Sequence, residues 1–270
     1  MFDRFYRRDL GGGLVLRWSR PDDVEDIVYL VSSVFRLKED APLNTHMGDL
    51  MKEMLSGKFP VMASSDVVVV EDTHRKEHPL VASTCLWHQT WEYEGIPFEI
   101  GRPEIVATDP DYRNRGLIRA IFELIHARSE ADGHLVQGIT GISYFYRQFG
   151  YEYALDLDVN RATPFSLIPE AKEGEPEACT LRDATLEDLP LIVELYNRQK
   201  TAYPVSTQFD EQWWRYQIQT WNGAVADGHW HIFMLLDVEG KTQGYLTLPM
   251  IRWRQLSLIH ISEPTRQAEI

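Results

Sequence analysis

The stretch Ile105-Val-Ala-Thr-Asp-Pro-Asp-Tyr-Arg-Asn-Arg-Gly-Leu-Ile118 decides the fold of this chain. It predicts the end of a strand, a short polar loop, and a helix that opens at Arg113-x-x-Gly116. The free backbone N–H groups of such a helix start favour anions, and a glycine there permits close backbone approach. Arg113, Arg115 and Arg119 add positive charge. The pattern therefore predicts a pyrophosphate cradle that is neither a P-loop nor a G-x-G-x-x-G loop.

The composition is that of an ordinary globular protein. The chain has 270 residues, of which 44% are hydrophobic and 25% are charged, which argues against disorder, collagen and coiled coil. A net charge of −14 without any long Lys/Arg run argues against a nucleic-acid partner. No segment reaches the about 18 apolar residues of a membrane span, and no apolar signal core follows the first arginines. We therefore expect a cytoplasmic protein without a membrane partner, and the two cysteines fit a reducing compartment.

Apolar patterning predicts strands and helices on both sides of the opening stretch. One predicted helix begins at residue 21, and two others cover 47–55 and 115–130. A short helical turn is predicted over 144–148. The predicted strands cover 14–18, 67–70, 80–91, 97–108, 135–139 and 151–159. This order predicts an α/β (α+β) domain with one mixed central sheet.

The pattern restarts after about 160 residues. Residues 1–162 hold the elements above, and 163–178, with three prolines and an acidic run, are predicted to be a linker. The strand-to-helix start around Arg17 and Asp23 then recurs around Arg182 and Asp188, at a constant offset of 165. Strands over 232–238 and 244–250 would repeat the first meander. We infer a degenerate duplication in which 179–255 form a partial second domain, with chance similarity as the alternative.

The last fifteen residues, 256–270, resemble a translated sequencing-library adapter. Residues 256–266 match the conceptual translation of such an adapter without a break. They are therefore set aside from the fold prediction, and we expect the native chain to continue differently beyond residue 255.

A second motif, Phe145-Tyr-Arg-Gln-Phe-Gly-Tyr151, follows the predicted helix and strand. With Arg113-x-x-Gly116 and the order of elements between them, it resembles the GNAT (N-acetyltransferase) superfamily over about residues 14–160. The resemblance implies a GNAT-like central sheet flanked by helices, followed by a truncated second GNAT-like copy. The doubled domain and the string Tyr112-Arg-Asn-Arg-Gly-Leu-Ile-Arg-Ala120 resemble the enhanced intracellular survival (Eis-like) type.

The resemblance implies acetyl-CoA as the acyl donor. Strand backbone near Val106 and Thr108 would bind the pantetheine arm and polarise the thioester carbonyl. Ile118 stands where the superfamily has Gly or Ala, so its side chain is expected to point away from the pyrophosphate. The residues that would hold the pyrophosphate are Arg113, Asn114, Arg115, Gly116, Leu117 and Ile118.

The resemblance also implies catalytic roles. Tyr146 would protonate the departing thiolate, because a phenol with a pKa near about 10 stays protonated at neutral pH. A packed tyrosine that supports the next turn is the alternative. Glu104 or a water would take the proton of the amine. Strand alternation places Arg102, Glu104, Val106 and Thr108 on one face, which also permits a salt bridge between Arg102 and Glu104.

The predicted function is therefore an acetyl-CoA-dependent N-acetyltransferase. A primary amine of a small molecule or of lysine attacks the thioester directly, so Cys85 is given no role. The acidic net charge favours a cationic acceptor. Trp87, Trp91 and Tyr93 either line the acceptor pocket or pack at the sheet. A non-catalytic acyl-CoA-binding or regulatory module is the alternative, and the full-length protein could form a homo-oligomer.

No metal site is expected from the sequence. His88, His126 and His134 have no ligand spacing with a carboxylate or a cysteine along the chain.

Overall fold

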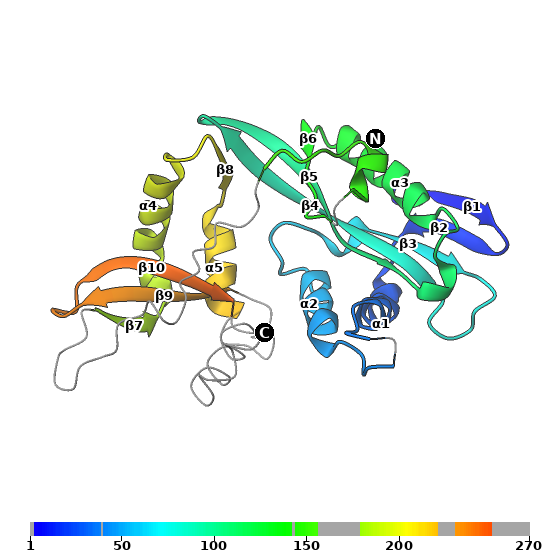
Figure 1. Ribbon diagram of the computed structural model, residues 1–270, viewed down its shortest axis with the longest axis horizontal. Helices are drawn as coiled ribbons and strands as arrows, with labels where there is room; N and C mark the ends of the chain where they lie inside the picture. Colours follow the sequence, from blue (N-terminus) through cyan, green and yellow to red (C-terminus); the bar gives the residue numbers. More distant parts are fainter. Residues whose placement is uncertain (1–2, 39, 142–143, 156–178, 221–229, 250–270) are drawn as a thin grey trace, which may run out of the picture. The chain divides into compact units, whose positions relative to one another are not determined.

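The computed structural model describes residues 3–38, 40–141, 144–155, 179–220 and 230–249 (Figure 1). These belong to two compact units. Met1–Tyr151 and Arg198–Tyr216 form the first, and Glu152–Asn197 and Gln217–Ile270 form the second. The predicted linker over 163–178 and the tail over 256–270 lie outside the described residues.

The first unit is built on one mixed sheet in the order β1-β2-β3-β4-β5-β6, and β8 pairs with β4. Neighbouring strands are antiparallel except for the parallel pair β5 and β6. This confirms the predicted mixed α/β fold. The strands are β1 (Arg7–Gly11), β2 (Leu14–Trp18), β3 (Val67–Asp72), β4 (Leu80–Tyr93), β5 (Ile96–Thr108), β6 (Val136–Gln137) and β8 (Val205–Gln208).

Helices cover both faces of this sheet (Figure 1). Val67 and Val69 of β3 pack with α1 and α2, whereas Val68 and Val70 pack with α3, and all four are 0% exposed. A run of valines with no polar residue is what a strand covered on both faces requires, because successive side chains point to opposite sides. None of the described helices is long and apolar enough to cross a membrane. The helices are α1 (Val24–Val34), α2 (Thr45–Leu55) and α3 (Leu117–Ala131).

Residues 151–155 do not form the first part of the strand that alternation predicts over 151–159. Residues 151–155 form no regular structure, and 156–159 lie outside the described residues. Tyr151 instead docks against α3: its ring centre lies 6.0 Å from that of Phe122, and its hydroxyl donates to Gln137 at 2.8 Å. Alternation was a poor guide here because one anchored tyrosine can use its apolar ring without pairing its backbone.

Other differences are smaller. The strand predicted over 135–139 shortens to β6, and the hairpin of β1 and β2 was not predicted. Its turn uses three successive glycines, Gly11, Gly12 and Gly13, all with positive φ, which permits the tight reversal.

The second unit contains a three-stranded antiparallel sheet in the order β10-β9-β7. From β7 the chain passes through a 3-10 turn into α4. The elements of the second unit are β7 (Cys179–Asp183), most of α4 (Leu189–Lys200), β9 (Trp230–Asp237) and β10 (Thr242–Pro249). Most of α5 (Glu211–Thr220) belongs to the first unit, which includes Arg198–Tyr216.

The internal geometry of this sheet matches that of β2 and β3. β2 pairs with β3 antiparallel, and each partner has a counterpart 165 residues further along in β7 and β9. Arg17↔Val69, for example, corresponds to Arg182↔Met234. The register shift in the hairpin of β3 and β4 recurs at the corresponding position of β9 and β10. α1 and α4 also begin 165 residues apart.

A buried ion pair links the first strand-to-helix connection to the sheet. Arg17, 4% exposed, donates to both carboxylate oxygens of Asp23 at 2.6 and 2.8 Å and to Glu71 at 2.7 Å.

Arg17→Met is expected to lower the free energy of unfolding by about 3–5 kcal/mol, because two carboxylates lose their partner. Arg182→Met, which breaks the corresponding pair with Asp188, should cost about 1 kcal/mol or less, since that arginine side chain is 42% exposed. Urea unfolding measures both, and equal losses would contradict the expectation.

Candidate active site

Strand β5 carries an irregularity that sets the geometry of the site. Ile105 has a positive φ of 49°, and the register against β4 shifts between Ser83 and Cys85. Such a bulge adds one residue and reverses the face taken by the side chains after it. Val106 accordingly packs in the core cluster on the α3 side, whereas Ile105 and Ala107 pack in the cluster with α1 and α2.

The single face predicted for Arg102, Glu104, Val106 and Thr108 is therefore wrong. The guanidinium of Arg102 lies 5.3 Å from the ring centre of Trp87, which packs on the α1 and α2 side, opposite to Val106. Alternation read from a sequence assumes an unbroken pleat, and the bulge breaks it.

β5 and β6 diverge after a short parallel contact. They pair at Ile100↔Val136 and Gly101↔Gln137, with one further bond from the Gly138 N–H to the Gly101 carbonyl at 3.1 Å. Among the described residues, the part of β5 that follows pairs with β4 alone. Its other edge therefore offers unpaired backbone groups, and a ligand with amides can bind such an edge as an added strand would.

The loop between β5 and α3 leaves a helix start without a protein cap. Asp109 accepts a hydrogen bond from the Asp111 N–H at 3.1 Å and begins the 3-10 turn Pro110–Tyr112. Two left-handed residues follow, Asn114 with φ 61° and Gly116 with φ 75°. Gly116 precedes α3 and has no side chain to accept the first helical N–H groups, so these groups are available to an anion.

The three arginines of this segment are not equivalent. Arg115 donates to the Asp111 carbonyl at 2.8 Å, and Arg119 donates to Gln148 at 3.1 Å. Arg113 is exposed: its backbone N–H bonds the Pro110 carbonyl at 3.3 Å, but within the described part of the chain its side chain has no hydrogen bond or ion pair. Arg113 is therefore the arginine that can bind an anion without giving up a contact.

Leu117 and Ile118 can contribute backbone to the cradle but not side chains. Leu117 is 4% exposed, and Ile118 packs against the same core cluster on the α3 side. This packing is compatible with the expectation that the Ile118 side chain points away from a pyrophosphate, which stays a prediction. A Cβ at Gly116 would meet nothing within 4 Å, so the space outside the loop is open.

Tyr146 begins the short 3-10 helix Tyr146–Phe149 and is 9% exposed. Its ring centre lies 5.8 Å from that of Phe122, and a Cβ at Gly141 would come within 2.6 Å of the ring. Burial and, after it, the charge of Glu104 raise the pKa of Tyr146. The phenol is therefore protonated at neutral pH, and among the described residues its hydroxyl has no hydrogen-bond partner.

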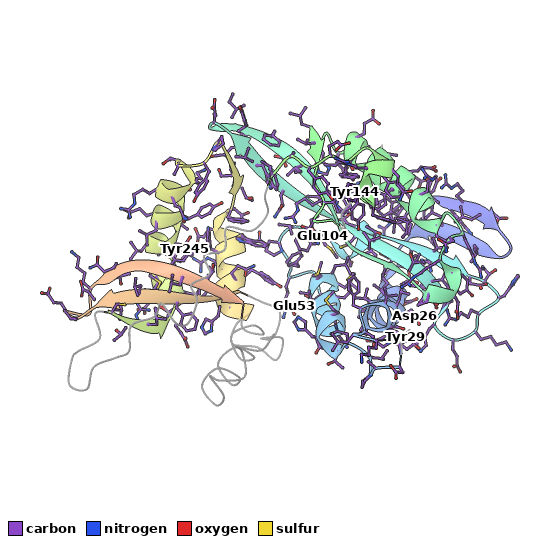
Figure 2. The ribbon with its side chains drawn as sticks, viewed as in Figure 1. Asp26, Tyr29, Glu53, Glu104, Tyr144 and Tyr245 are labelled. Atoms are coloured by element: carbon purple, nitrogen blue, oxygen red, sulfur yellow. The ribbon has the colours of Figure 1, made fainter. Side chains whose placement is uncertain are left out.

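Glu104, which is labelled in Figure 2, forms the predicted ion pair with Arg102. Arg102 also donates to Gln89 at 3.2 Å, which fixes its guanidinium. Burial raises the pKa of Glu104 above its usual value, and the Arg102 charge opposes this rise. The raised pKa makes the carboxylate a stronger base than an exposed one, but one oxygen is already engaged. The role of Glu104 as base stays a prediction.

Cys85 has the properties of a structural thiol. It is 1% exposed, its Sγ donates to the Glu104 carbonyl at 3.2 Å, and burial raises its pKa. A reactive cysteine needs an accessible thiolate, which this environment disfavours. Trp87 also packs, with its ring centre 5.2 Å from that of Phe59.

Two residues that shape the site were not predicted. Asp109 both begins the loop turn and accepts a hydrogen bond from Arg75 at 2.8 Å. The Asp-Pro pair is a turn signal that could have identified it. Gly141, which makes room for the ring of Tyr146, has no local signal because the contact is tertiary.

The fold is similar to that of solved N-acyltransferases. A probable N-acyltransferase from Enterococcus faecalis matches with a TM-score of 0.57 and 18% identity, over 87% of this chain and 54% of that one. Saccharomyces cerevisiae N-myristoyltransferase with bound myristoyl-CoA matches with a TM-score of 0.62 and 13% identity, over 90% and 61%. These identities show the fold alone, and the chain spans about three fifths or less of the length of either structure.

The family follows from the sequence. A family model described as acetyltransferase (GNAT) domain matches residues 16–154, just over half of the chain. The chain therefore belongs to the GNAT acetyltransferase family. No curated protein matches the sequence.

Proposed function

We propose that this chain is an N-acetyltransferase that takes its acyl group from acetyl-CoA. The observation that carries the proposal is an uncapped helix start at Gly116 that follows directly on the open edge of β5. The helix start suits a pyrophosphate, and the open strand edge suits a chain of amides. Acyl-CoA combines both groups in one molecule, and the family description supports this class of donor.

Each end of the donor has identified partners in this proposal. The pyrophosphate accepts hydrogen bonds from the N–H groups of the loop and first turn, from Asn114 to Ile118, and pairs with Arg113. The pantetheine amides pair with the backbone of β5 around Val106 and Thr108. The thioester carbonyl then lies near the bulge, where a backbone N–H can polarise it.

The reaction needs no covalent intermediate on the protein. The amine nitrogen attacks the thioester carbon, a C–N bond forms, and the C–S bond breaks. Tyr146 donates its hydroxyl proton to the leaving sulfur. Its raised pKa keeps this hydroxyl protonated, and therefore able to donate, at neutral pH. Glu104 or a water accepts the proton that the amine loses. Solvent then returns the proton to Tyr146.

The walls behind the bulge favour a short acyl group. Cys85 and Ala107, which lie next to Ile105 in the sheet, are 1% and 0% exposed and pack in the core. Room for a long acyl chain would have to be opened in this packed layer, which costs about 1–3 kcal/mol. We therefore take acetyl-CoA, rather than a long-chain acyl-CoA, as the donor.

The acceptor is a primary amine, and the charge of the chain supports a cationic one. A net charge of −14 attracts polyamines, aminoglycosides or lysine side chains over long range.

The second unit is, in this proposal, a partial copy of the first, as in the Eis-like type. The support is the shared offset of 165 residues in strand pairing, helix start and hairpin register shift. The bidentate pair of Arg17 with Asp23 also recurs as Arg182 with Asp188. Chance similarity of the two strand-to-helix starts gives no reason for β7 and β9 to share the register of β2 and β3, which is the observation that supports a partial copy.

The activity is tested by measuring the free CoA thiol that forms when the full chain is incubated with an acyl-CoA and an amine. With a panel of cationic amines, acetyl-CoA is expected to give amine-dependent thiol release. Myristoyl-CoA should give a kcat/KM at least about tenfold lower, because of the packed layer behind the bulge. Omission of the amine provides the control for hydrolysis. The absence of amine-dependent release for every acyl-CoA would favour the non-catalytic module, and a preference for the long chain would overturn the choice of acetyl.

A further inference from the structure

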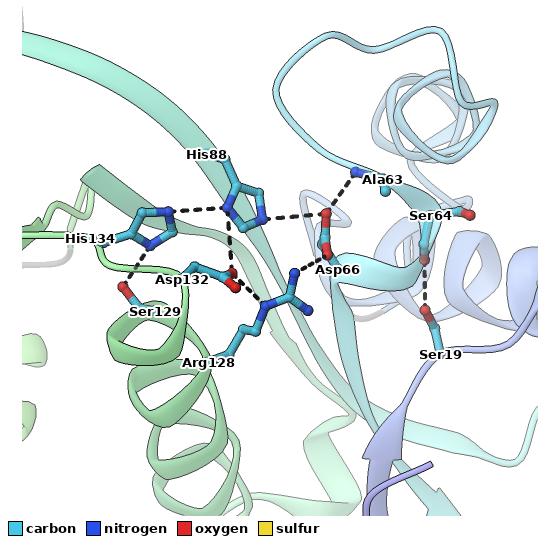
Figure 3. Close-up of polar contacts among 9 residues, drawn as sticks. All are labelled: Ser19, Ala63, Ser64, Asp66, His88, Arg128, Ser129, Asp132 and His134. Atoms are coloured by element: carbon cyan, nitrogen blue, oxygen red, sulfur yellow. Dashed lines mark hydrogen bonds and ion pairs between the residues drawn. The ribbon is translucent and has the colours of Figure 1, made fainter. Parts of the chain in front are cut away.

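Three side chains of metal-binding type meet where β4 passes the end of α3 (Figure 3). His88 lies on β4, and Asp132 and His134 follow α3. His88 Nδ1 lies 3.1 Å from His134 Nε2 and 3.8 Å from Asp132 Oδ2. One ligand atom from each residue lies within 4.8 Å of the other two. Spacing along the chain does not reveal this set, because only the fold brings His88 of β4 to Asp132 and His134.

The separations suit a single bound ion. Zinc binds histidine nitrogen at about 2.0–2.1 Å and carboxylate oxygen at about 2.0–2.2 Å, so tetrahedral ligand atoms lie about 3.3 Å apart. The distances of 3.1 and 3.8 Å from His88 Nδ1 lie on either side of this value. Three protein ligands would leave a fourth position for water.

Each imidazole has a polar group at its other nitrogen: a hydrogen bond at His134, and an ion-pair contact without a hydrogen bond at His88 (Figure 3). His88 Nε2 lies 3.4 Å from Asp66 Oδ2, and His134 Nδ1 lies 2.9 Å from Ser129 Oγ. Asp66 is itself fixed by the Ala63 N–H at 2.8 Å. A histidine that binds a metal through one nitrogen usually has its other nitrogen held in this way, which sets the ring orientation and tautomer.

The charged side chains around the cluster are two carboxylates and one guanidinium. Arg128 pairs with both Asp66 and Asp132, so two carboxylates face one guanidinium, and a bound ion would replace Arg128 at Asp132 Oδ2, the oxygen that lies 3.8 Å from His88 Nδ1. The side chains of His88 and Asp132 are 28% and 24% exposed, which provides a path from solvent. A Cβ at Gly101 would lie 2.6 Å from His134 Nδ1, so the absence of a side chain there lets His134 approach β5.

We propose that His88, Asp132 and His134 bind a divalent transition-metal ion, with Zn²⁺ as the ion whose ligand preferences fit best. The ion would tie β4 to the connection between α3 and β6. It would thereby fix β6 in its short contact with β5, just before the two strands diverge. This inference does not rest on the proposed acetyltransferase activity.

Calorimetric titration of the metal-free full chain with Zn²⁺ tests the proposal. One equivalent is expected to bind, and Zn²⁺ should raise the Tm in a way that EDTA reverses. Asp132→Asn and His134→Gln should each weaken Zn²⁺ binding at least about tenfold, and Co²⁺ should give the absorption of a four-coordinate site only in the unmodified chain. His74→Ala, which removes an exposed histidine away from the cluster, is the matched control and should bind normally.

Two results would overturn the proposal. One is an unchanged Zn²⁺ affinity in the double variant Asp132→Asn/His134→Gln. The other is an equal loss in His74→Ala, which would show that the chain's nine histidines bind zinc without a defined site. Asp132→Asn keeps the test valid if His134→Gln fails to fold, because it is nearly isosteric and lies at the surface.

Discussion

Replacement of Gly116 by glutamate is expected to weaken acetyl-CoA binding by a factor of about one hundred or more. The new carboxylate would stand at the helix start that we assign to the pyrophosphate. Two like charges 4 Å apart repel by about 4 kcal/mol at an effective dielectric constant of about 20, which corresponds to several hundredfold in Kd. A Cβ at this position meets nothing within 4 Å, so the side chain does not disturb the core.

Two further variants separate charge from backbone strain. Gly116 has a φ of 75°, and a side chain in this region costs about 1–2 kcal/mol. Gly116→Ala carries the strain alone and should weaken binding about tenfold or less. Gly95→Glu introduces the same charge at a glycine with a φ of 80° and open surroundings in the turn between β4 and β5, and should leave Kd unchanged. Calorimetry measures all three, and normal binding by Gly116→Glu would remove the cradle assignment.

Tyr146→Phe is expected to lower kcat by about a hundredfold or more and to leave the Kd for acetyl-CoA within about twofold. The loss is the size that a general acid contributes, and affinity is retained because the ring still packs against Phe122. Tyr151→Phe is the matched control in the same aromatic cluster. Its hydroxyl bonds Gln137, so its loss should cost about 1 kcal/mol of stability but little turnover. Steady-state kinetics and thermal unfolding measure the two effects.

The pH profile provides a second test of Tyr146. A general acid must be protonated, so activity that depends on it is present below its pKa and is lost above it. Burial and Glu104 raise the pKa of Tyr146, so this basic loss should begin above the ordinary phenol value of about 10. If Tyr146→Phe turns over as fast as the unmodified chain, Tyr146 is a packing residue and a different donor protonates the sulfur.

The parts of the site that depend on local sequence were predictable. The loop from Asp109 to Gly116 and the start of α3 follow from turn residues, glycine and helix periodicity, which act over a few neighbouring positions. The direction of Ile118 also followed, because helix periodicity places it toward the sheet.

The parts that depend on tertiary pairing were not predictable from one sequence. The bulge at Ile105 arises where β5 pairs with β4, and it reversed the face expected for Val106. The cluster of His88 with His134 joins residues that lie on different elements and meet only through the sheet. Local patterns record which residues are apolar or polar, but they do not record which distant strands become neighbours.

Calorimetric titration of the full chain with acetyl-CoA directly measures whether the helix start at Gly116 and the edge of β5 bind this donor. We predict one site with a Kd in the micromolar range, or about −8 kcal/mol, and weaker binding when Arg113 is replaced by Ala. The absence of binding by a chain that circular dichroism shows to be folded would contradict the assignment of an acyl-CoA site.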